Sequence, residues 1–434
     1  MKIAVIGTGY VGLVTAAGLA EFGNQVVGTD KDGEKIDQIA RGIVPIYEPG
    51  LDALLADNIR KGRLSFSPDL NAVIQEADVV FVCVGTPQHS DGSADMSQIE
   101  EVSRLIADNL NRFKLVVEKS TVPVKTSFWI KRTIGLYKKT DTDFDIASNP
   151  EFLREGSAVE DFLHPDRIIL GVETDRARDL LFGIYEKLGD RVVVTNIDTA
   201  ELIKHASNSF LALKISYINL ISNICEKTDA NVEQVAQGMG LDPRIGHRFL
   251  KAGIGYGGSC FPKDIKALVK IGEDLAVDMS LLRDADRINL DRIRVFIELI
   301  KKALWILKDK RVAVLGLAFK PETDDIREAP SIRIVRELLR EGARLRLFDP
   351  QAMGNMKEVF SAEADRLEYC DSAYQAAEGA NVLIVLTEWE EFAGLDLGRI
   401  KGAMANPIIV DGRNIFDPAD VRRLGFEYFS IGRR

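Results

Sequence analysis

The chain has 434 residues, too many for one ordinary domain and enough for about three. Apolar residues make up 46% and charged residues 28%, so the composition favours packed cores and excludes disorder. The formal net charge is -10, from 56 Lys and Arg against 66 Asp and Glu, and no basic block is long enough to bind nucleic acid.

The sequence also lacks the signals of membrane and secreted proteins. No stretch approaches the ~18 consecutive apolar residues of a membrane span, and the N-terminus runs into a strand instead of a secretory signal. The cysteines and histidines lie scattered, without the spacing of a disulfide framework or a metal site: Cys83, Cys225, Cys260, Cys370, His89, His164, His205 and His247. We therefore expect a cytoplasmic, multidomain protein that acts on small molecules, with no metal and with neither nucleic acid nor membrane as a partner.

The first part of the chain alternates strand and helix patterns. Strand KIAVIG runs into a Gly-rich turn, a small-residue helix from Val11 to Phe22 and a strand that ends at Asp30. Continuous Val/Ile runs of the kind found in a parallel sheet covered on both faces follow at 77–85, 114–120, 143–148, 167–172 and 191–196. We predict one Rossmann-like domain over residues 1–196.

The pattern then changes to a helical bridge and afterwards returns. From Asp198 to Lys227 there is no Gly or Pro, which predicts one helix about 45 Å long, and Asp198 with Glu201 resembles a capping box. Helical segments continue through 307. RVAVLGLAF then restarts the N-terminal pattern, a weak internal repeat. The prediction is an α/β fold in which two Rossmann-like doubly wound sheet domains, 1–196 and 308–434, are joined by a long central helix and helical bridge at 197–307.

A dinucleotide fingerprint, GTGYVG, lies between the first strand and the first helix. Gly7 permits the tight turn, Gly9 lets the backbone approach a pyrophosphate, and Gly12 lets helix and strand pack closely. The phosphates then lie at the helix N-terminus, where unpaired N–H groups favour negative charge. Asp30 ends the second strand, where a carboxylate accepts the ribose hydroxyls and disfavours a 2′-phosphate, so we predict NAD rather than NADP. A Rossmann-like domain without a cofactor is the alternative.

Two threonines follow later strands of the same predicted sheet. Thr86 lies in VGTP and Thr121 in STVP, at the carboxyl ends of strands and so near the cofactor crevice. Ordinary turn chemistry would explain either threonine taken alone.

A glycine-rich loop leads to a cysteine in FLKAGIGYGGSCFPKD at 249–264. Its glycines allow the backbone to wrap closely round a ligand. Pro262 suits the start of a helix, which places Cys260 just before a helix N-terminus with Lys263 nearby. Both features lower a thiol pKa and favour a nucleophilic thiolate. The alternative is a buried structural cysteine, which is what we expect of the other three.

Lys204 and Asn208 lie four residues apart on the long predicted helix and so share one face. A lysine amid apolar neighbours suits the stabilisation of an oxyanion. A surface lysine beside a hydrogen-bonded asparagine is the alternative that the residues leave open.

Blocks that run nearly the whole length of the chain resemble the UDP-glucose/GDP-mannose dehydrogenase family. They are GTGYVG at 7–12, VGTP at 84–87, STVP at 120–123, NPEFLREG at 149–156, ELIKHASNSFLALKISYIN at 201–219, GYGGSCFPKD at 255–264, LGLAFKPETDDIRE at 315–328 and DGRN at 411–414. The resemblance implies an NAD-dependent, four-electron oxidation of UDP-glucose to UDP-glucuronate for polysaccharide biosynthesis. It also implies a homodimer joined through the helical bridge and a second sheet domain that holds the UDP moiety.

The resemblance assigns the catalytic roles. Cys260 forms a thiohemiacetal and then a thioester, and Lys204 with Asn208 stabilises oxyanions. Asp264 helps to activate water. Thr121 and Glu151 serve proton transfer and water placement, with Glu151 as the candidate base.

The same resemblance supplies the binding residues. The cofactor contacts are Gly7, Gly9, Tyr10, Val11, Gly12, Asp30, Lys35, Thr86, Thr121, Glu155, Lys263 and Arg327. The substrate contacts are Glu151, Phe152, Leu153, Arg154, Lys204, Asn208, Phe249, Leu250, Lys251, Ala252, Gly253, Gly257, Lys320 and Arg413, with Arg244 reaching the neighbouring subunit's site. The second turn, LGLAFK, lacks the fingerprint glycines, and we do not predict a second NAD site there.

Other functions remain as alternatives. The same reaction on GDP-mannose or a UDP-N-acetylhexosamine would share the cysteine loop. A two-electron hydroxyacid dehydrogenase would share the Rossmann domain and a Lys-x-x-x-Asn pair but has no use for Cys260. A non-catalytic nucleotide-sugar sensor would not require that Cys260, Lys204, Asn208 and Asp264 are all retained.

Overall fold

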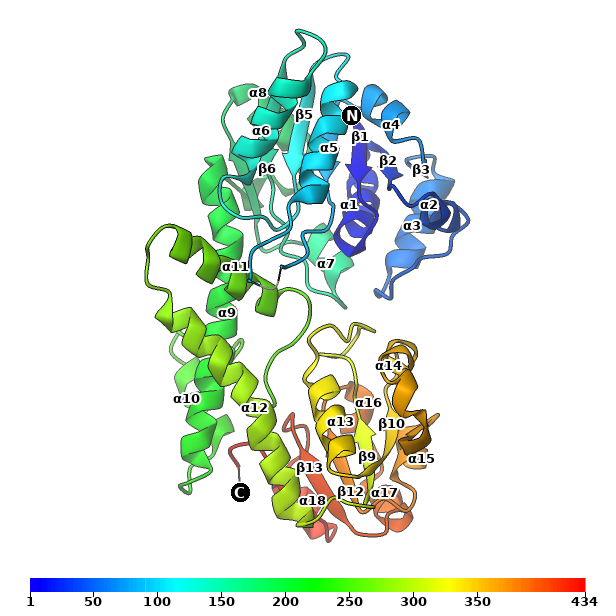
Figure 1. The fold of residues 1–434 in the computed structure, drawn as a ribbon, viewed down its shortest axis with the longest axis vertical. Helices are drawn as coiled ribbons and strands as arrows, with labels where there is room; N and C mark the ends of the chain where they lie inside the picture. Colours follow the sequence, from blue (N-terminus) through cyan, green and yellow to red (C-terminus); the bar gives the residue numbers. More distant parts are fainter. Residues whose placement is uncertain (90, 434) are drawn as a thin grey trace. The chain divides into compact units, whose positions relative to one another are not determined.

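A computed structural model of the chain describes residues 1–89 and 91–433 (Figure 1). The chain divides into two compact units with one sheet each. Unit 1 comprises Met1–Ser207 and Lys266–Ala276, and unit 2 comprises Asn208–Ile265 and Val277–Arg434. Helices α9 (Ile197–Cys225) and α11 (Phe261–Asp274) contribute residues to both units. The domain boundaries at 196 and 307 stay a prediction.

The sheet of unit 1 has eight strands in the order β3-β2-β1-β4-β5-β6-β7-β8. The strands are β1 (Lys2–Ile6), β2 (Gln25–Thr29), β3 (Leu64–Phe66), β4 (Val79–Val82), β5 (Lys114–Glu118), β6 (Phe144–Ser148), β7 (Ile168–Val172) and β8 (Val192–Thr195). The order of the first six strands is that of a doubly wound dinucleotide-binding sheet, which the sequence pattern predicted.

Helices cover both faces of this sheet. They are α1 (Tyr10–Glu21), α2 (Gly33–Ala40), α3 (Leu51–Arg60), α4 (Leu70–Glu76), α5 (Ser97–Asp108), α6 (Thr126–Tyr137), α7 (Ala158–Leu163) and α8 (Asp175–Ile184). Alternate residues of β1 enter different cores: Ile3 and Val5 pack with α1, α3, α7 and α8, whereas Ala4 and Ile6 pack with α4, α5 and α6. Burial on both faces explains why β1, β4 and β5 read as continuous apolar runs, whereas β8 at the sheet edge has Val193 and Val194 exposed.

One strand departs from the expected parallel sheet. β7 pairs antiparallel with β6 through Ala147 and Ser148, and β8 is parallel to β7. The link from β6 to β7 carries only the short helix α7, which packs on α1, instead of a full crossover helix. The fingerprint of a parallel strand, a buried apolar run, is shared by any strand buried on both faces, so the sequence did not reveal the reversal.

Unit 2 repeats the sheet order of unit 1. Its six strands lie in the order β11-β10-β9-β12-β13-β14, the same 3-2-1-4-5-6 pattern, and every strand pair is parallel. The strands are β9 (Arg311–Leu315), β10 (Arg344–Phe348), β11 (Leu367–Tyr369), β12 (Val382–Val385), β13 (Ile408–Asp411) and β14 (Glu427–Ser430). The internal repeat is therefore confirmed.

The helices of unit 2 form two groups. Those that follow the strands are α13 (Pro330–Arg340), α14 (Met353–Val359), α15 (Ala373–Ala377), α16 (Glu390–Ala393), α17 (Leu397–Ala403) and α18 (Pro418–Arg423). The bridge helices are α9, α10 (Val232–Gly240) and α12 (Ser280–Leu304), and apolar side chains of all three join one core with β9, β10 and β12. The bridge residues of unit 2 therefore pack directly on its sheet.

Helix α9 is confirmed, but its predicted capping box is wrong. The side chain of Asn196, not Asp198, accepts the Thr199 N–H. Glu201 instead accepts the N–H groups of Lys125 and Ser127 at 2.6 and 2.8 Å, at the start of α6. Tertiary packing thus directs the Glu201 carboxylate to the start of a neighbouring helix instead of its own.

Within 1–89 and 91–433, no helix is long and apolar enough to cross a membrane.

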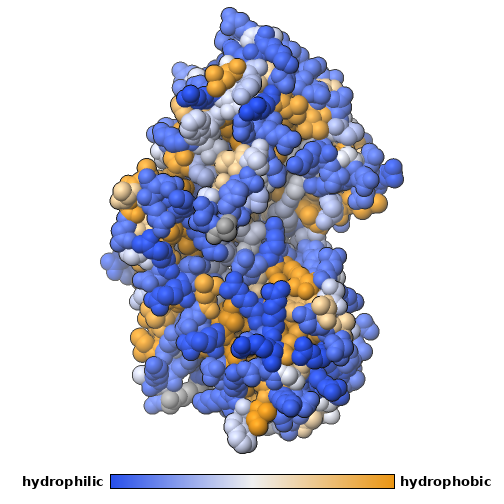
Figure 2. All heavy atoms as spheres, in the orientation of Figure 1, coloured by the Kyte–Doolittle hydropathy of each residue, from blue (hydrophilic) through white to orange (hydrophobic). Residues whose placement is uncertain are grey.

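The surface drawn in Figure 2 is mostly hydrophilic, with apolar side chains interspersed.

Inside, several ionisable groups are buried. Glu118 at the end of β5 is 1% exposed, and one carboxylate oxygen accepts the Ser120 N–H at 2.6 Å. Burial, helped by the nearby Glu201 carboxylate, raises the pKa of Glu118 to about 8.

This burial predicts a pH-dependent stability. The carboxyl is protonated in the folded chain up to pH values near 8 and only up to about 4.5 when unfolded, so its stabilising contribution is complete below 4.5 and is lost as pH rises towards 8. Glu118→Gln removes this titration. We expect the variant to gain free energy of unfolding relative to the parent by about 1.4 kcal/mol per pH unit within this window, measured by urea unfolding from pH 5 to 9. An unchanged difference across that range would contradict the buried carboxyl.

Candidate functional site

The turn between β1 and α1 has the shape that its glycines predicted. Gly7 has a φ of +95°, and a Cβ there would lie 2.6 Å from the Cys83 carbonyl oxygen. A Cβ on Gly12 would lie 1.7 Å from the Gly7 carbonyl oxygen, so only glycine lets α1 begin so close to the strand. A Cβ on Gly9 would meet nothing within 4 Å. Gly9 therefore borders open space, as a backbone that approaches a pyrophosphate requires.

Asp30 lies beside this turn. Its carboxylate accepts the backbone N–H and the hydroxyl of Thr8, at 2.9 and 3.0 Å, and the ammonium of Lys35 at 3.1 Å. Burial opposes the charge, but these hydrogen bonds from Thr8 and Lys35 outweigh it and hold the pKa of Asp30 below its ordinary value. The ionised carboxylate can therefore accept hydrogen bonds from the hydroxyl groups of a ribose.

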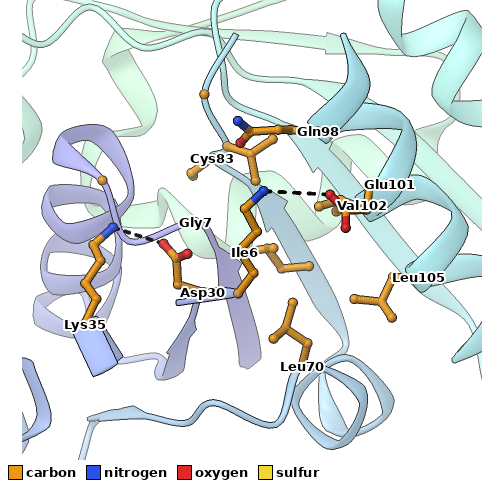
Figure 3. A pocket seen from close by; sticks show the side chains of 14 residues that line it. Ile6, Gly7, Asp30, Lys35, Leu70, Cys83, Gln98, Glu101, Val102 and Leu105 are labelled. Atoms are coloured by element: carbon orange, nitrogen blue, oxygen red, sulfur yellow. Dashed lines mark hydrogen bonds and ion pairs between the residues drawn. The ribbon is translucent and has the colours of Figure 1, made fainter. Parts of the chain in front are cut away.

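A cavity of about 270 Å³ opens between the turn and helices α4 and α5 (Figure 3). Gly7, Gly9, Asp30 and Lys35 line it, as predicted for a cofactor site. The residues that the sequence analysis missed are Ile6, Lys31, Leu70, Cys83, Val84, Gly85, Gln98, Glu101, Val102 and Leu105. Leu70, Val102 and Leu105 fit the apolar pattern of a covering helix, which does not distinguish a core position from the wall of a cavity. Val84 and Gly85 lie in the VGTP block, which could have indicated them. Lys31 and Glu101 form an ion pair of 4.0 Å at this cavity.

Tyr10, the first residue of α1, is tied to the segment that contains Glu155. The Tyr10 hydroxyl donates to Glu48, and the same carboxylate accepts the N–H groups of Gly156 and Ala158 at 2.6 Å each. Burial and the Glu48 carboxylate raise the pKa of Tyr10. Glu48 was missed by the sequence analysis because its partners are distant in sequence: Tyr10 lies 38 residues before it, and Gly156 and Ala158 lie 108 and 110 residues after it.

Two cofactor residues predicted in unit 1, Thr86 and Thr121, follow the ends of β4 and β5. Thr86 is buried, and its hydroxyl donates to the Thr121 carbonyl at 2.9 Å. His205 of α9 lies 2.8 Å from the Val122 carbonyl oxygen, which ties the same loop to that helix. Val11 lies in the first turn of α1 beside the open space at Gly9. These contacts fix the backbone that contains Thr121.

Glu151 and Lys204 form a buried ion pair in unit 1. Their side chains are 6% and 4% exposed, and the carboxylate and ammonium lie 2.7 Å apart. The second carboxylate oxygen accepts the Leu153 N–H at 2.6 Å, and the Lys204 ammonium lies 5.4 Å from the centre of the Phe152 ring. Two residues that are 53 positions apart in sequence, both predicted as catalytic, therefore meet in the structure. Arg154 is paired with Asp161 at the surface.

Cys260 directly precedes α11, as the sequence predicted. It is partly exposed, whereas the other cysteines are buried, and none of the four forms a disulfide. Its carbonyl accepts the Asp264 N–H at 2.8 Å, which closes the first turn of the helix. The thiol thus lies beside a helix N-terminus, whose positive end favours a thiolate.

Asp264 is the centre of a second cluster, in unit 2. It is 1% exposed, and its two oxygens accept the Asn208 amide at 2.6 Å and the Lys263 ammonium at 2.7 Å. Asn208 and Lys204 lie one turn apart on α9. The structure therefore joins three predicted site residues, Asn208, Lys263 and Asp264, one turn from Cys260.

The loop before Cys260 contains most of the predicted substrate residues of unit 2. Phe249 has a φ of +66° and packs 6.2 Å from the ring of Phe261. Arg413 donates to the carbonyls of Gly255 and Leu386 at 2.9 and 2.8 Å. The Arg327 carbonyl accepts the Gly258 N–H at 2.8 Å. Lys320 lies over the Phe319 ring, whereas Arg244 is at the surface, paired with Asp242 and remote from any predicted site residue by its contacts.

The turn after β9 is built differently from the first. Asp349 occupies the place that Asp30 has after β2, but its carboxylate accepts the N–H groups of Leu317 and Ala318 and the Trp389 indole N–H. A carboxylate has about four acceptor positions, and the N–H groups of Gln351 and Ala352 take the others. All acceptor positions of Asp349 are thus used within its own turn.

Across 1–89 and 91–433, no group of three or more His, Cys, Asp or Glu side chains could hold a metal ion.

Family models match nearly the whole chain. Residues 1–189 match the NAD binding domain of the UDP-glucose/GDP-mannose dehydrogenase family, residues 198–291 its central domain and residues 313–418 its UDP binding domain. Among curated proteins, the UDP-glucose 6-dehydrogenase of Rhizobium meliloti (strain 1021) is 46% identical, with 100% of both chains covered. UDP-glucose 6-dehydrogenase YwqF of Bacillus subtilis (strain 168) is 44% identical, with 100% of this chain and 98% of the relative covered.

Solved structures agree. The UDP-glucose dehydrogenase of Pyrobaculum islandicum matches with a TM-score of 0.93 and 37% identity, covering 100% of this chain and 98% of that one. A UDP-D-ManNAc dehydrogenase of Pyrococcus horikoshii matches with a TM-score of 0.87 and 30% identity, covering 100% and 99%. Together with the glycine turn, the Asp30 site and the Cys260 cluster, these matches lead to one conclusion: the chain belongs to the UDP-glucose/GDP-mannose dehydrogenase family.

Proposed function

We propose that the protein is an NAD-dependent UDP-glucose 6-dehydrogenase, which oxidises the C6 alcohol of UDP-glucose to the carboxylate of UDP-glucuronate. The observation that carries the proposal is the position of Cys260 at the start of α11, one turn from the Asp264–Asn208 hydrogen bond of 2.6 Å. A two-electron dehydrogenase has no need of such a thiol. A four-electron oxidation does, because an aldehyde has no second hydride to give until a nucleophile adds to its carbon.

The residues of unit 1 fit NAD. Gly9 borders open space at the N-terminus of α1, which has no side-chain cap, so its N–H groups can bind a pyrophosphate. Asp30 lines the cavity as an ionised acceptor for ribose hydroxyls, and the apolar walls at Leu70, Val102 and Leu105 suit an adenine ring. NAD supplies a hydride acceptor for both oxidations.

In the first oxidation, the alcohol at C6 loses a hydride and a proton and becomes an aldehyde. Glu151 takes the proton directly or through a water that Thr121 helps to hold. Lys204, 2.7 Å from Glu151, stabilises the negative charge that develops on the substrate oxygen.

In the second oxidation, the Cys260 sulfur bonds to the aldehyde carbon, and the carbonyl oxygen takes up a proton to give a thiohemiacetal. Loss of a second hydride from that carbon and of the hydroxyl proton gives a thioester. Water then adds to the thioester carbonyl, the C–S bond breaks, and the acid leaves with Cys260 restored as a thiol. Asp264 positions or deprotonates this water, and the Asn208 amide fixes the carboxylate and faces the oxyanion.

The curated relatives support glucose as the sugar. The most similar of those given above, at 44–46% identity, are named UDP-glucose 6-dehydrogenases, whereas the solved UDP-D-ManNAc enzyme is 30% identical. We place the reaction in the cytoplasm because none of the four cysteines forms a disulfide, as expected in a reducing compartment.

We further propose that the protein acts as a homodimer through α9. Five apolar residues of α9 remain exposed: Leu202, Phe210, Tyr217, Leu220 and Ile224. Their spacing matches the turns of a helix, so they share one face of α9. A row of exposed apolar side chains of this length is unusual on a monomer. Arg244, also exposed, would then be free to reach the neighbouring subunit's substrate.

The stoichiometry of NADH tests the chemistry. With excess NAD, we expect two NADH for each UDP-glucose consumed, because both hydrides leave C6. Cys260→Ser should stop after the first oxidation or form an ester that hydrolyses slowly, and should lower steady-state turnover at least ~1000-fold. A ratio of one in the parent protein would contradict the four-electron reaction, and full turnover by Cys260→Ser would contradict the thioester.

The choice of cofactor rests on Asp30. Asp30→Ala should lower kcat/KM for NAD at least ~10-fold, since the ribose loses its acceptor. Lys35 and Lys31 remain at the cavity, so the ratio of kcat/KM for NADP to that for NAD should rise. The double variant Asp30→Ala/Lys35→Met serves as the control and should lose the gain with NADP. An unchanged preference in Asp30→Ala would contradict this role.

The dimer is tested by a pair of matched substitutions. Leu220 and Leu424 are 43% and 44% exposed, and only Leu220 lies on the apolar face of α9. Leu220→Arg should produce a monomer in sedimentation velocity and lower turnover, whereas Leu424→Arg should change neither. A monomeric parent protein with full turnover would rule out the homodimer.

A further inference from the structure

The glycine-rich loop that leads to Cys260 is held by the burial of Ile254 and Tyr256 and by hydrogen bonds to its backbone. Gly253, Gly255, Gly257 and Gly258 offer no side chains for packing, and glycine loses more conformational entropy on ordering than any other residue. Something else must therefore keep the loop, and with it the cysteine, in one conformation. In unit 2, the groups that do so come largely from helices α9 and α12.

Asn289 of α12 forms two hydrogen bonds with the loop backbone. Its side-chain oxygen accepts the Tyr256 N–H at 2.8 Å, and its amide donates to the Tyr256 carbonyl at 3.0 Å. Both backbone groups of one loop residue are thus satisfied by a single side chain, which is 7% exposed. The fit is tight, because a Cβ on Gly255 would lie 2.5 Å from the Asn289 oxygen.

Two further residues hold the loop at Gly253. Asn219 of α9 accepts the Gly253 N–H at 2.8 Å, and Arg292 of α12 donates to the Gly253 carbonyl at 3.1 Å. Asn219 and Arg292 are 0% and 1% exposed. Arg292 lies one turn after Asn289, so both side chains project from the same face of α12. Burying three polar side chains costs free energy unless they find partners, and the loop backbone supplies several of them, with Asn223 as a further acceptor for Arg292.

The contact continues from Tyr256 to the cysteine. The Tyr256 ring packs edge-on against Phe261, with ring centres 5.8 Å apart and an interplanar angle of 83°. Phe261 is the first residue of α11 and the direct neighbour of Cys260. Because Asn289 fixes both backbone groups of Tyr256, it also limits where that ring, and the start of α11, can lie.

We propose that Asn289 is a positioning residue for the Cys260 thiol, acting through Tyr256 and Phe261, with Arg292 and Asn219 holding the preceding part of the loop. Its role falls on the second oxidation, when sulfur must meet the aldehyde carbon. It does not touch substrate or cofactor. A misplacement of about 1 Å at a reacting group can lower a rate about 100-fold, so a loop of glycines at this position needs such a device. This inference rests on the proposed function, in which Cys260 is the nucleophile.

The test resolves the two NADH equivalents in time. With enzyme in excess over UDP-glucose and saturating NAD, stopped-flow absorbance follows both hydride transfers in a single turnover. For Asn289→Ala we expect the first equivalent at a rate within about threefold of the parent and the second slowed at least ~10-fold, with KM for both substrates within about threefold. Equal slowing of both equivalents with a raised KM, or no slowing at all, would overturn the proposal.

A matched control separates positioning from loss of stability. Asn58 of α3 is 0% exposed and its side chain hydrogen-bonds to Leu54, Glu21 and Arg63 in unit 1. Asn58→Ala removes a comparable buried amide, and we expect it to lower the Tm while leaving the two NADH phases unchanged. If Asn289→Ala does not fold, Arg292→Lys tests the same loop, since it keeps the charge but loses the donor to Gly253; the second equivalent should then slow about threefold.

Two measurements are independent of the sugar reaction. Hydrogen exchange of the 253–258 backbone, followed by mass spectrometry, should quicken at least ~10-fold in Asn289→Ala and not in Asn58→Ala. The rate of Cys260 alkylation by iodoacetamide should change at least ~5-fold, and the other cysteines are buried and should stay unmodified. Faster exchange with unchanged alkylation would show that Asn289 is merely structural. One NADH per sugar in the parent would instead reject the proposed function, and the alkylation result would still decide the role of Asn289.

Discussion

Helix α9 orders predicted site residues within unit 1 and, separately, within unit 2, because its buried polar side chains must find partners away from water. Four of them find one beside loops that contain predicted site residues. Glu201 binds the start of α6, Lys204 pairs with Glu151, and Asn208 bonds Asp264. Further along, Asn219 accepts the Gly253 N–H. A long helix is the stiffest support that one chain can offer, and it allows a single element to order loops that are far apart in sequence.

Several charged side chains are buried near the predicted catalytic residues of unit 1. Glu151 and Lys204 are paired, whereas Lys119 donates to the neutral oxygens of Asn149, and burial lowers the pKa of Lys119 to about 8. Asn149 begins the segment that contains Glu151. A buried ion pair seldom adds stability over apolar packing, so its retention fits a chemical role at the site better than a structural one.

The two sheets show how one topology serves two purposes. Both have the 3-2-1-4-5-6 order and both place an aspartate after the second strand. Asp30 lines an open cavity, where Gly12 lets α1 begin close to the strand and Gly9 leaves space beside the turn. The Asp349 carboxylate instead accepts hydrogen bonds from the backbone of its own turn. Helix α13 begins only at Pro330, well after the end of β9. The difference lies in the glycines of the turn rather than in the sheet.

The sequence by itself determined the elements whose signal is local. The GTGYVG turn, the long helix α9, the helix that begins after Cys260 and the repeat of the α/β pattern all follow from glycine placement and apolar periodicity. Only the tertiary structure decided the rest. It reversed β7 against β6, directed Glu201 to α6 instead of to its own helix, and brought Glu151 to Lys204. It also placed Glu48 on Tyr10 and Asn289 on the Cys260 loop. These outcomes depend on contacts between residues that lie tens to hundreds of positions apart, and no periodicity within a single segment encodes which partner a buried polar group will find.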